Sequence, residues 1–233
     1  MLGVLGGMGP LASAHFMLRL TQLTSATRDQ DHIPTVLWSD PRVPDRTLGR
    51  LGDGADPLPW LLRGIRGLRA AGCKAIAIPC NTAHGWYDEL LDAAQMPILH
   101  IVDAAAAELR QRHVSTGTIG VMGTQATLTM RLYQERLGAR GWECIIPEQD
   151  QMDQLVSPGI ALVKANRPAD AYAPLAEVAR SLIQRGATSV VLGCTEIPLG
   201  LQAGPAPDVP VIDTIDALAR AAIAWTERSS SRN

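Results

Sequence analysis

Two matching stretches of the chain decide its fold: GLRAAGCKAIAIPCNTA, residues Gly67–Ala83, and SLIQRGATSVVLGCTEI, residues Ser181–Ile197. In each stretch a glycine closes a predicted helix, an apolar run of strand length follows, and a proline or glycine ends that run. A cysteine, Cys80 or Cys194, then stands where the next helix begins. Because ligands bind at the carboxyl ends of strands in open parallel α/β sheets, this duplicated scaffold can place two thiols on either side of one substrate.

Two further pairs of blocks repeat in the same order. Leu2–Ser13 aligns with Ile119–Met130, and Pro97–Asp103 aligns with Pro210–Asp216, at nearly the same offset as the cysteine stretches. Such repetition indicates two copies of one βα arrangement, and its turn-plus-helix connections require parallel strands. We therefore predict an α/β fold of two pseudo-symmetric domains, each a mainly parallel sheet of about four strands flanked by helices. The active site is expected in the cleft between them.

The apolar pattern predicts alternating strands and helices along the chain. The expected strands are Leu2–Gly6, Thr35–Ser39, Ala75–Pro79, Pro97–Ile101, Thr118–Met122, Glu143–Pro147, Ser189–Leu192 and Val209–Thr214. The expected helices are Ser13–Ala26, Leu58–Ala71, Trp86–Ala94, Asp103–Arg112, Leu128–Leu137, Gln151–Ala165, Ala169–Arg185 and Asp216–Arg228. The stretch Ser39–Pro57 is rich in proline, aspartate, arginine and glycine, which favours a functional loop over a linker.

Composition excludes several classes of protein. Hydrophobic residues make up 46% of the 233 residues and charged residues 19%, as in globular proteins with a sizeable core. The net charge of −2 favours neither nucleic acid nor an anionic membrane as a partner. The N-terminus lacks a basic region before its apolar residues, and no apolar run approaches the roughly 20 residues of a membrane span. The four cysteines show no disulfide spacing, so we expect a cytoplasmic protein. We interpret Cys73 and Cys144, which stand beside or inside strand runs, as ordinary buried and unreactive residues.

Polar residues follow each of the two organising cysteines. Asn81 and Thr82 follow Cys80, whereas Thr195 and Glu196 follow Cys194. Small polar side chains and free amides at a helix start suit an anionic ligand, and the same amides favour a thiolate over a thiol. We therefore interpret both cysteines as reactive.

Two other motifs are weak signals, one for a dinucleotide and one for a metal ion. Gly7–Ala12 matches the G-x-G-x-x-A dinucleotide fingerprint, but the second copy has Thr124–Thr127 there, so we interpret it as a tight turn beside a small ligand. An NAD-dependent oxidoreductase stays open as an alternative on this turn alone. Cys80 and His84 lack a second pair at zinc spacing, and nothing points to pyridoxal phosphate, so we predict neither a metal ion nor a cofactor.

Four motifs resemble those of the aspartate/glutamate racemase superfamily, and most closely its aspartate racemase branch. They are GGMGP at Gly6–Pro10, VPDRT at Val43–Thr47, PCNTAH at Pro79–His84 and GCTE at Gly193–Glu196. The resemblance covers nearly the whole chain. Glutamate racemases carry Cys-Thr-His at the last motif, where this chain has Glu196, and arylmalonate decarboxylases keep only the second cysteine.

The resemblance implies a cofactor-independent racemase that interconverts the L- and D-enantiomers of an acidic amino acid, with aspartate as the first expectation. A thiolate takes the α-proton on one face while a thiol gives a proton on the other. The resemblance assigns Cys194 to the L-enantiomer and Cys80 to the D-enantiomer, which the residues alone leave open. It also implies a homodimer, with the last helix packing on the first half, so that the domains are residues 1–102 plus 215–233 and residues 103–214.

The resemblance also indicates residues that bind substrate. Arg46 and Lys164 match positions where aspartate-specific members bind the second carboxylate, and cations are the chemistry that this group needs. The remaining expected substrate-binding residues are Met8, Asn81, Thr82, Ala83, Thr124, Thr127, Thr195 and Glu196. Asp40 departs from the family, whose members often have Asn-Asn-Pro where this chain has Ser-Asp-Pro. Its charge would oppose an acidic substrate or meet the substrate ammonium.

Several functions therefore remain as alternatives. One is a broad-specificity amino-acid racemase, and another is an isomerase or decarboxylase of the same fold that uses one cysteine. More distant are the NAD-binding oxidoreductase and a non-catalytic amino-acid-binding module. All share a small-molecule ligand, and only a racemase needs both thiols.

Overall fold

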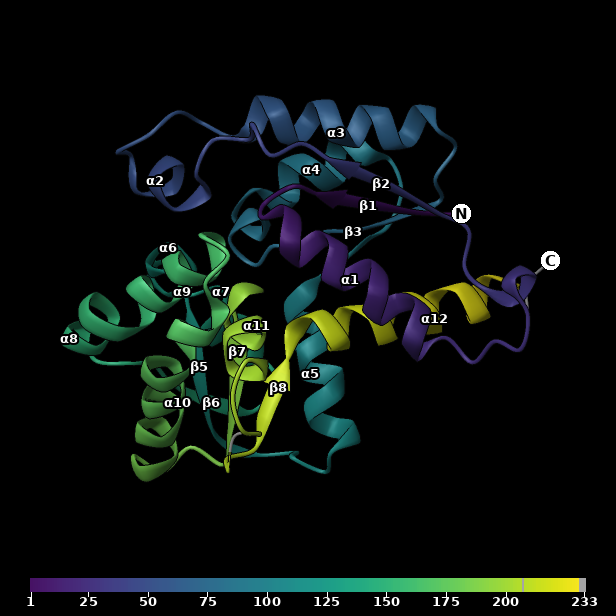
Figure 1. Ribbon diagram of the computed structural model, residues 1–233. Coiled ribbons are helices and arrows are strands. Elements are labelled where there is room, and N and C mark those ends of the chain that lie inside the picture. The colour runs from purple at the N-terminus through teal and green to yellow at the C-terminus, as the bar shows by residue number, and fades with distance from the viewer. Residues whose placement is uncertain (207, 231–233) are drawn as a thin grey trace. The chain divides into compact units, whose positions relative to one another are not determined.

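A computed structural model describes residues 1–206 and 208–230 of the chain (Figure 1). The chain divides into two compact units, of which the first holds Met1–Ala104 and the C-terminal segment from Ile215, and the second holds Ala105–Thr214. Helix α5 (Ile101–Gln111) and the start of helix α12 (Thr214–Ser230) carry the chain across the two boundaries. The first unit is thus discontinuous in sequence.

The first unit contains a four-stranded parallel sheet with the strand order β2-β1-β3-β4. Its strands are β1 (Leu2–Gly6), β2 (Thr35–Ser39), β3 (Ala75–Ala77) and β4 (Ile98–Leu99). Its helices are α1 (Pro10–Leu23), α2 (Arg46–Leu51), α3 (Leu58–Ala70) and α4 (Tyr87–Ala94), with 3₁₀ turns η1 (Asp29–Asp31) and η2 (Thr82–Trp86). Every residue of β1 is buried, as its apolar sequence and central position require.

Helices α3 and α1 cover opposite faces of this sheet (Figure 1). The buried face of helix α3 carries Leu61, Ile65 and Leu68. All three are fully buried in a core that also contains Leu5 of β1. Burial of each such side chain contributes about 1.5–3 kcal/mol. On the other face, Gly6 meets Ser13 of α1 so closely that any Cβ there would overlap the serine side chain.

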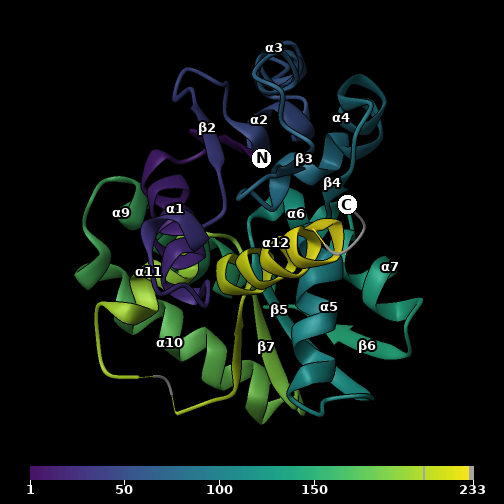
Figure 2. The same cartoon turned by 90° about the vertical axis from the view of Figure 1, so that its right-hand side faces the viewer.

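The second unit repeats this topology in a parallel sheet of order β6-β5-β7-β8. Its strands are β5 (Gly117–Gly123), β6 (Trp142–Ile145), β7 (Ser189–Gly193) and β8 (Val211–Asp213). Its helices are α6 (Gln125–Thr129), α7 (Leu132–Gly138), α8 (Gln149–Gln151), α9 (Ser157–Lys164), α10 (Pro168–Gln184) and α11 (Glu196–Gln202), with a π turn η3 (Met152–Val156). Helix α10 lies along the sheet and contacts β5 and β7 (Figure 2). Two four-stranded parallel sheets with flanking helices confirm the predicted fold class.

The loop expected over Ser39–Pro57 contains a helix that the sequence prediction missed. The Asp45 carboxylate accepts hydrogen bonds from the backbone N–H groups of Thr47 (2.8 Å) and Leu48 (3.0 Å), which caps α2 at its start. Gly52 closes the helix in the left-handed region at φ 91°. These caps are visible in the sequence, but six residues between proline and glycine gave too short an apolar pattern to detect.

Other boundaries also differ from the prediction. Helix α1 begins at Pro10 rather than Ser13, because a proline at the first helical position needs no N–H partner. The helix expected over Leu128–Leu137 is two helices, α6 and α7, separated at Arg131, whose φ is 55°. Strand β3 ends at Ala77, so two residues rather than none separate it from Cys80.

Helix α12 belongs to the first unit, where it joins α1 through an ion pair between Asp216 and Arg19. The Nε and Nη2 atoms of Arg19 donate to the two carboxylate oxygens at 2.5 and 2.7 Å. In the described part of the chain, no helix combines the length and apolar character that crossing a membrane requires.

Candidate active site

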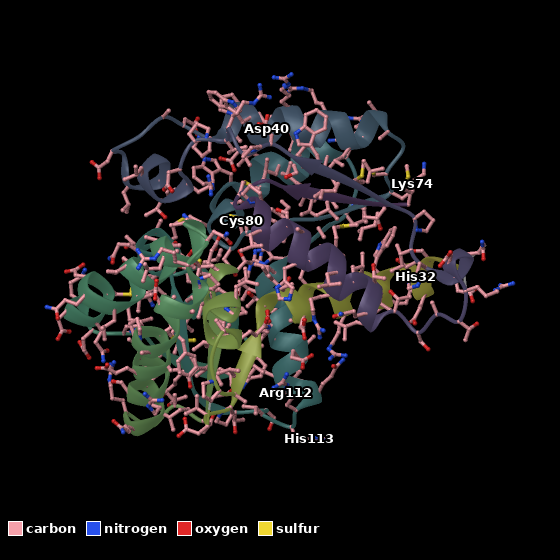
Figure 3. All side chains as sticks on the ribbon, viewed as in Figure 1. His32, Asp40, Lys74, Cys80, Arg112 and His113 are labelled. Carbon is pink, nitrogen blue, oxygen red and sulfur yellow. The ribbon has the colours of Figure 1, made fainter. Side chains whose placement is uncertain are left out.

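Cys80 lies just beyond the carboxyl end of the first sheet. In Figure 3 it stands at the opposite end of the sheet from Lys74, which precedes β3. The residue is 5% exposed, and its backbone N–H donates to the Ile78 carbonyl at 2.8 Å. The three following residues predicted to bind substrate, Asn81, Thr82 and Ala83, are also buried. This end of β3 is therefore a buried, partly polar position rather than an open surface.

His84 fixes the Cys80 turn through both ring nitrogens. Its Nε2 accepts the backbone N–H of Ile101 at 3.2 Å, so the proton of a neutral ring sits on Nδ1, 2.9 Å from the Cys80 carbonyl oxygen. The His100 ring lies 4.7 Å away, tilted against it. Both His84 nitrogens are thus occupied by the backbone, which leaves none for the metal interpretation of Cys80 and His84. Within the described ranges, no group of three or more His, Cys, Asp or Glu is arranged to hold a metal ion.

The Gly6–Pro10 turn is held by its own helix. The Ser13 hydroxyl accepts the Gly7 N–H at 2.8 Å and donates to the Gly9 carbonyl at 2.9 Å. Gly7 has φ 90°, and a Cβ there would overlap the Asp40 backbone. Met8 is buried beside it. Because Ser13 already takes the Gly7 amide, that amide is not free for a pyrophosphate, which favours the tight turn over the dinucleotide fingerprint.

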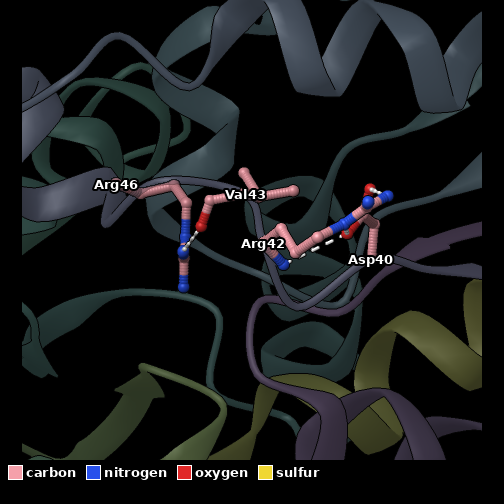
Figure 4. A network of polar contacts seen from close by, with 4 residues as sticks. All are labelled: Asp40, Arg42, Val43 and Arg46. Carbon is pink, nitrogen blue, oxygen red and sulfur yellow. Dashed lines mark hydrogen bonds and ion pairs between the residues drawn. The ribbon is translucent and has the colours of Figure 1, made fainter.

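Asp40 is neutralised by a neighbour that the sequence prediction overlooked. Arg42 donates to the two Asp40 carboxylate oxygens from Nε at 2.8 Å and from Nη2 at 2.9 Å (Figure 4). The Arg42 backbone N–H adds a third bond at 3.1 Å, and these bonds lower the pKa of Asp40 to about 2. The charge of Asp40 is therefore already paired within its own turn.

Arg46 is a buried cation without a carboxylate partner among the described residues. It is 9% exposed, and its Nη1 donates to the backbone carbonyl of Val43 at 3.1 Å (Figure 4). The same Nη1 donates to the backbone carbonyl of Pro44 at 2.9 Å. Its Nε is buried and makes no hydrogen bond. Helix α2, which begins at Arg46, contacts the η2 turn that follows Cys80. A held guanidinium with an unused N–H suits an anionic ligand.

Cys194 occupies the equivalent place in the second unit, between the end of β7 and the start of α11. Cys194 is 4% exposed, and its thiol donates to Oε2 of Glu196 at 3.1 Å. The Thr195 hydroxyl donates to the same oxygen at 3.3 Å. Glu196 therefore contacts the cysteine directly, and its expected contact with substrate stays a prediction.

The prediction that helix amides favour a Cys194 thiolate over a thiol is wrong. Burial raises the pKa of the thiol well above its usual value, and the negative charge of Glu196 raises it further. A backbone hydrogen bond at Glu196 and the positive charge of Lys164 act in the opposite direction but are outweighed. Lys164 is therefore within electrostatic reach of Cys194, on the last turn of α9.

Tyr133 and Thr214 support the Cys194 strand end, and sequence reasoning did not identify either. Tyr133 is fully buried, and a Cβ at Gly193 would lie 3.0 Å from its ring. Its side chain bonds to that of Thr214, whose hydroxyl donates to the Leu192 carbonyl at 2.9 Å. Burial raises the pKa of Tyr133, so the phenol is neutral. No local motif marks these residues, because their contacts with the strand are long range.

Thr124 and Thr127 lie just beyond the end of β5. The Thr124 hydroxyl caps α6 by accepting the Thr127 N–H at 3.2 Å, and the two hydroxyls lie 3.0 Å apart. Their contact with substrate stays a prediction.

The other two cysteines differ from this pair. Cys73 is buried as expected, whereas Cys144 is only half-buried. Burial raises the pKa of both thiols, that of Cys144 to about 11. Neither position favours a thiolate, which agrees with their interpretation as unreactive residues.

Each unit thus gathers its predicted residues at the carboxyl edge of its own sheet. The first unit places Met8 after β1, Cys80 after β3 and Arg46 on the helix that contacts the Cys80 turn. The second places Thr124 after β5 and Cys194 after β7. Each edge holds one buried thiol, and we call the two edges candidate half-sites.

Comparison with solved structures identifies the class of protein. The Picrophilus torridus aspartate racemase matches with a TM-score of 0.85 and 31% identity, covering 97% of this chain and 94% of that chain. A putative Asp/Glu racemase from Yersinia pestis matches with a TM-score of 0.73 and 26% identity, covering 97% and 98%. The broad specificity amino-acid racemase RacX of Bacillus subtilis is 28% identical over 229 residues, 96% of each chain. The fold and these relatives define an amino-acid racemase.

The family follows from the match of residues 5–222 to the model of the Asp/Glu/Hydantoin racemase family. The chain belongs to this family, which confirms the resemblance identified in its motifs.

Proposed function

We propose that the protein is a cofactor-independent racemase that interconverts L- and D-aspartate, with Cys80 and Cys194 as its two bases. The observation that carries this proposal is the placement of two buried thiols at equivalent strand ends, one in each copy of a duplicated unit. Racemisation needs a proton taken from one face of Cα and another given to the opposite face, and two such thiols supply both groups. The site is proposed to form where the two half-sites meet the substrate.

The proposed reaction runs in two proton transfers. Cys194, as a thiolate, removes the α-proton of the L-enantiomer, and Cys80, as a thiol, gives a proton to the opposite face. The roles are exchanged for the D-enantiomer, following the assignment that the resemblance implies. The charge that develops on the α-carboxylate is stabilised by hydrogen-bond donors at the two helix starts. The α-carboxylate and the ammonium are proposed to be held by Asn81, Thr82, Thr195 and the amides around Met8. The proposed substrate-binding set also includes Ala83, Thr124, Thr127 and Glu196.

An acidic substrate is supported by the charges of the first half-site. Arg46 is a buried cation that only backbone carbonyls hold, with Nε unused, so a substrate carboxylate has a partner there. Asp40 does not oppose such a substrate, because Arg42 already pairs its charge. Lys164 would add a second cation from the second unit.

Broader specificity is the second candidate. The observation that favours it is the 28% identity to the broad specificity racemase RacX across 96% of both chains. A homodimer is also proposed, from the resemblance alone, and light scattering at micromolar concentration tests it.

The test of the proposed function is solvent deuterium exchange followed by proton NMR. The protein in D₂O, without added cofactor, is given L-aspartate, D-aspartate, L-glutamate or L-alanine. We expect the α-proton signal of both aspartate enantiomers to disappear while optical rotation decays to zero. Loss of carbon dioxide would indicate a decarboxylase, exchange only with added NAD an oxidoreductase, and binding without exchange a binding module.

A further inference from the structure

The Cys194 thiol directs its hydrogen at a buried carboxylate. Its Sγ lies 3.1 Å from Oε2 of Glu196, and the Thr195 hydroxyl donates to that oxygen at 3.3 Å. Cys194 and Glu196 are each 4% exposed. A carboxylate already in hydrogen-bond contact with a thiol is placed to accept its proton.

We propose that Glu196 is the immediate proton acceptor of Cys194, so that the two residues form a thiol–carboxylate dyad. This inference rests on the proposed function and adds a catalytic residue to it, since Glu196 touches the reacting sulfur. The S–H bond of Cys194 breaks, its proton moves to Oε2 of Glu196, and the electron pair stays on sulfur. The thiolate then takes the α-proton of the substrate, so a new S–H bond forms as the Cα–H bond breaks.

The remaining protons also balance. The electron pair of the Cα–H bond moves toward the α-carboxylate and then to the proton that Cys80 gives from the opposite face. Glu196 afterwards releases its proton to solvent, and Cys80 regains one from solvent. The enzyme returns to its starting state without any other reactant.

The dyad solves an electrostatic problem at this position. Loss of the thiol proton to solvent would leave two negative charges side by side in a buried place, which is unfavourable. Transfer along the hydrogen bond keeps a single negative charge. The other groups that act on Cys194 are Lys164 of α9, a positive charge, and Tyr133 of α7, a buried neutral phenol. Neither accepts a proton, so Glu196 is the acceptor that the described contacts provide.

Glu196→Gln separates this role from a purely electrostatic one, because the two roles predict opposite changes in the rate of racemisation. If Glu196 only holds the thiol protonated, removal of its charge makes the thiolate easier to form, and the enzyme becomes faster. If Glu196 accepts the proton, its loss leaves the thiol without an acceptor, and the enzyme becomes slower. Glu196→Asp keeps the carboxylate, and Glu177→Gln removes a matched charge from the exposed face of α10.

The experiment measures kcat/KM for aspartate against pH in all four proteins. At neutral pH we expect Glu196→Gln to lose about 10²- to 10⁴-fold, the usual contribution of a general base. The loss should shrink as pH rises, since solvent can then remove the thiol proton. Glu196→Asp should retain more activity than Glu196→Gln, and Glu177→Gln should match the wild type. Because the enantiomers are equally stable, kcat/KM must be equal in the two directions, which checks each data set.

Alkylation of Cys194 by iodoacetamide, followed by peptide mass spectrometry, supplies a readout that needs no turnover. The dyad predicts that at neutral pH Glu196→Gln is alkylated more slowly than the wild type, because its thiol lacks the proton acceptor, and that it also racemises more slowly. Equal or faster racemisation by Glu196→Gln at neutral pH overturns the proposal, as does equal or faster alkylation. A wild-type protein that exchanges no α-proton contradicts the proposed function instead, so the two failures are distinguishable.

Discussion

Replacing Arg46 with methionine should weaken the recognition of aspartate far more than that of alanine. Arg46 is 9% exposed, and its buried Nε makes no hydrogen bond with any described residue, while Nη1 is held by two backbone carbonyls. A substrate carboxylate would complete this arrangement with a charge-assisted hydrogen bond, which contributes about 1.5–3 kcal/mol. At about 1.4 kcal/mol for each tenfold change, the expected loss is about 10- to 150-fold in kcat/KM.

The assay is α-proton exchange in D₂O with aspartate and with alanine, which lacks the second carboxylate. Arg66→Met is the matched control, because Arg66 is an exposed arginine on α3 of the same unit. Urea unfolding of each variant reports whether the lost carbonyl contacts of Arg46 disturb the fold. Equal, small losses for both substrates in Arg46→Met would refute the reasoning, since Arg46 would then act only within the protein.

Three further predictions concern stability. Thr124→Ala removes the cap of α6 and should lower the free energy of unfolding by about 0.5–2 kcal/mol in urea, whereas Thr124→Ser should not; equal values would contradict the capping role. His84→Phe removes one hydrogen bond from the Cys80 carbonyl and one from the Ile101 N–H, so it should lower the free energy of unfolding by about 1–3 kcal/mol, and an unchanged urea midpoint would contradict this. The raised pKa of Cys194 favours the folded protein below the unfolded thiol pKa, about 8.5, and this contribution is lost as pH rises toward the folded value. The free energy of unfolding should therefore fall more steeply above about pH 8.5 in the wild type than in Cys194→Ala. Identical slopes of this free energy against pH would contradict the raised pKa of Cys194.

The fold was predictable because the sequence repeats itself. The cysteine stretches and the flanking blocks align at nearly the same offset, and the boundaries of strands β1 and β2 match the apolar runs Leu2–Gly6 and Thr35–Ser39. Helix α2 was missed, because a six-residue helix has too few positions to show a period. Its caps, Asp45 and Gly52, were the available signal.

The site was predictable only in part. Residue spacing placed Cys80 and Cys194 at strand ends, but spacing carries no information about which group a side chain contacts. The bond from Cys194 to Glu196 depends on side-chain torsions within a buried turn. Burial of the thiol, followed by the negative charge of Glu196, reverses the expected direction of the thiol pKa. The Asp40–Arg42 pair escaped notice for the same reason, although the two residues are neighbours in sequence.

The central claim is that two thiols, one in each half-site, carry the reaction. Proton NMR in D₂O on Cys80→Ser and on Cys194→Ser, each with L- and D-aspartate, tests it most directly. A hydroxyl is too weak a base at neutral pH to replace a thiol, so neither variant should invert its substrate. Each keeps one thiol, so Cys80→Ser should exchange the α-proton of the L-enantiomer only, and Cys194→Ser that of the D-enantiomer only. Racemisation of L-aspartate by Cys80→Ser at near wild-type rate would contradict the two-thiol mechanism and leave Cys80 as a buried residue at a strand end.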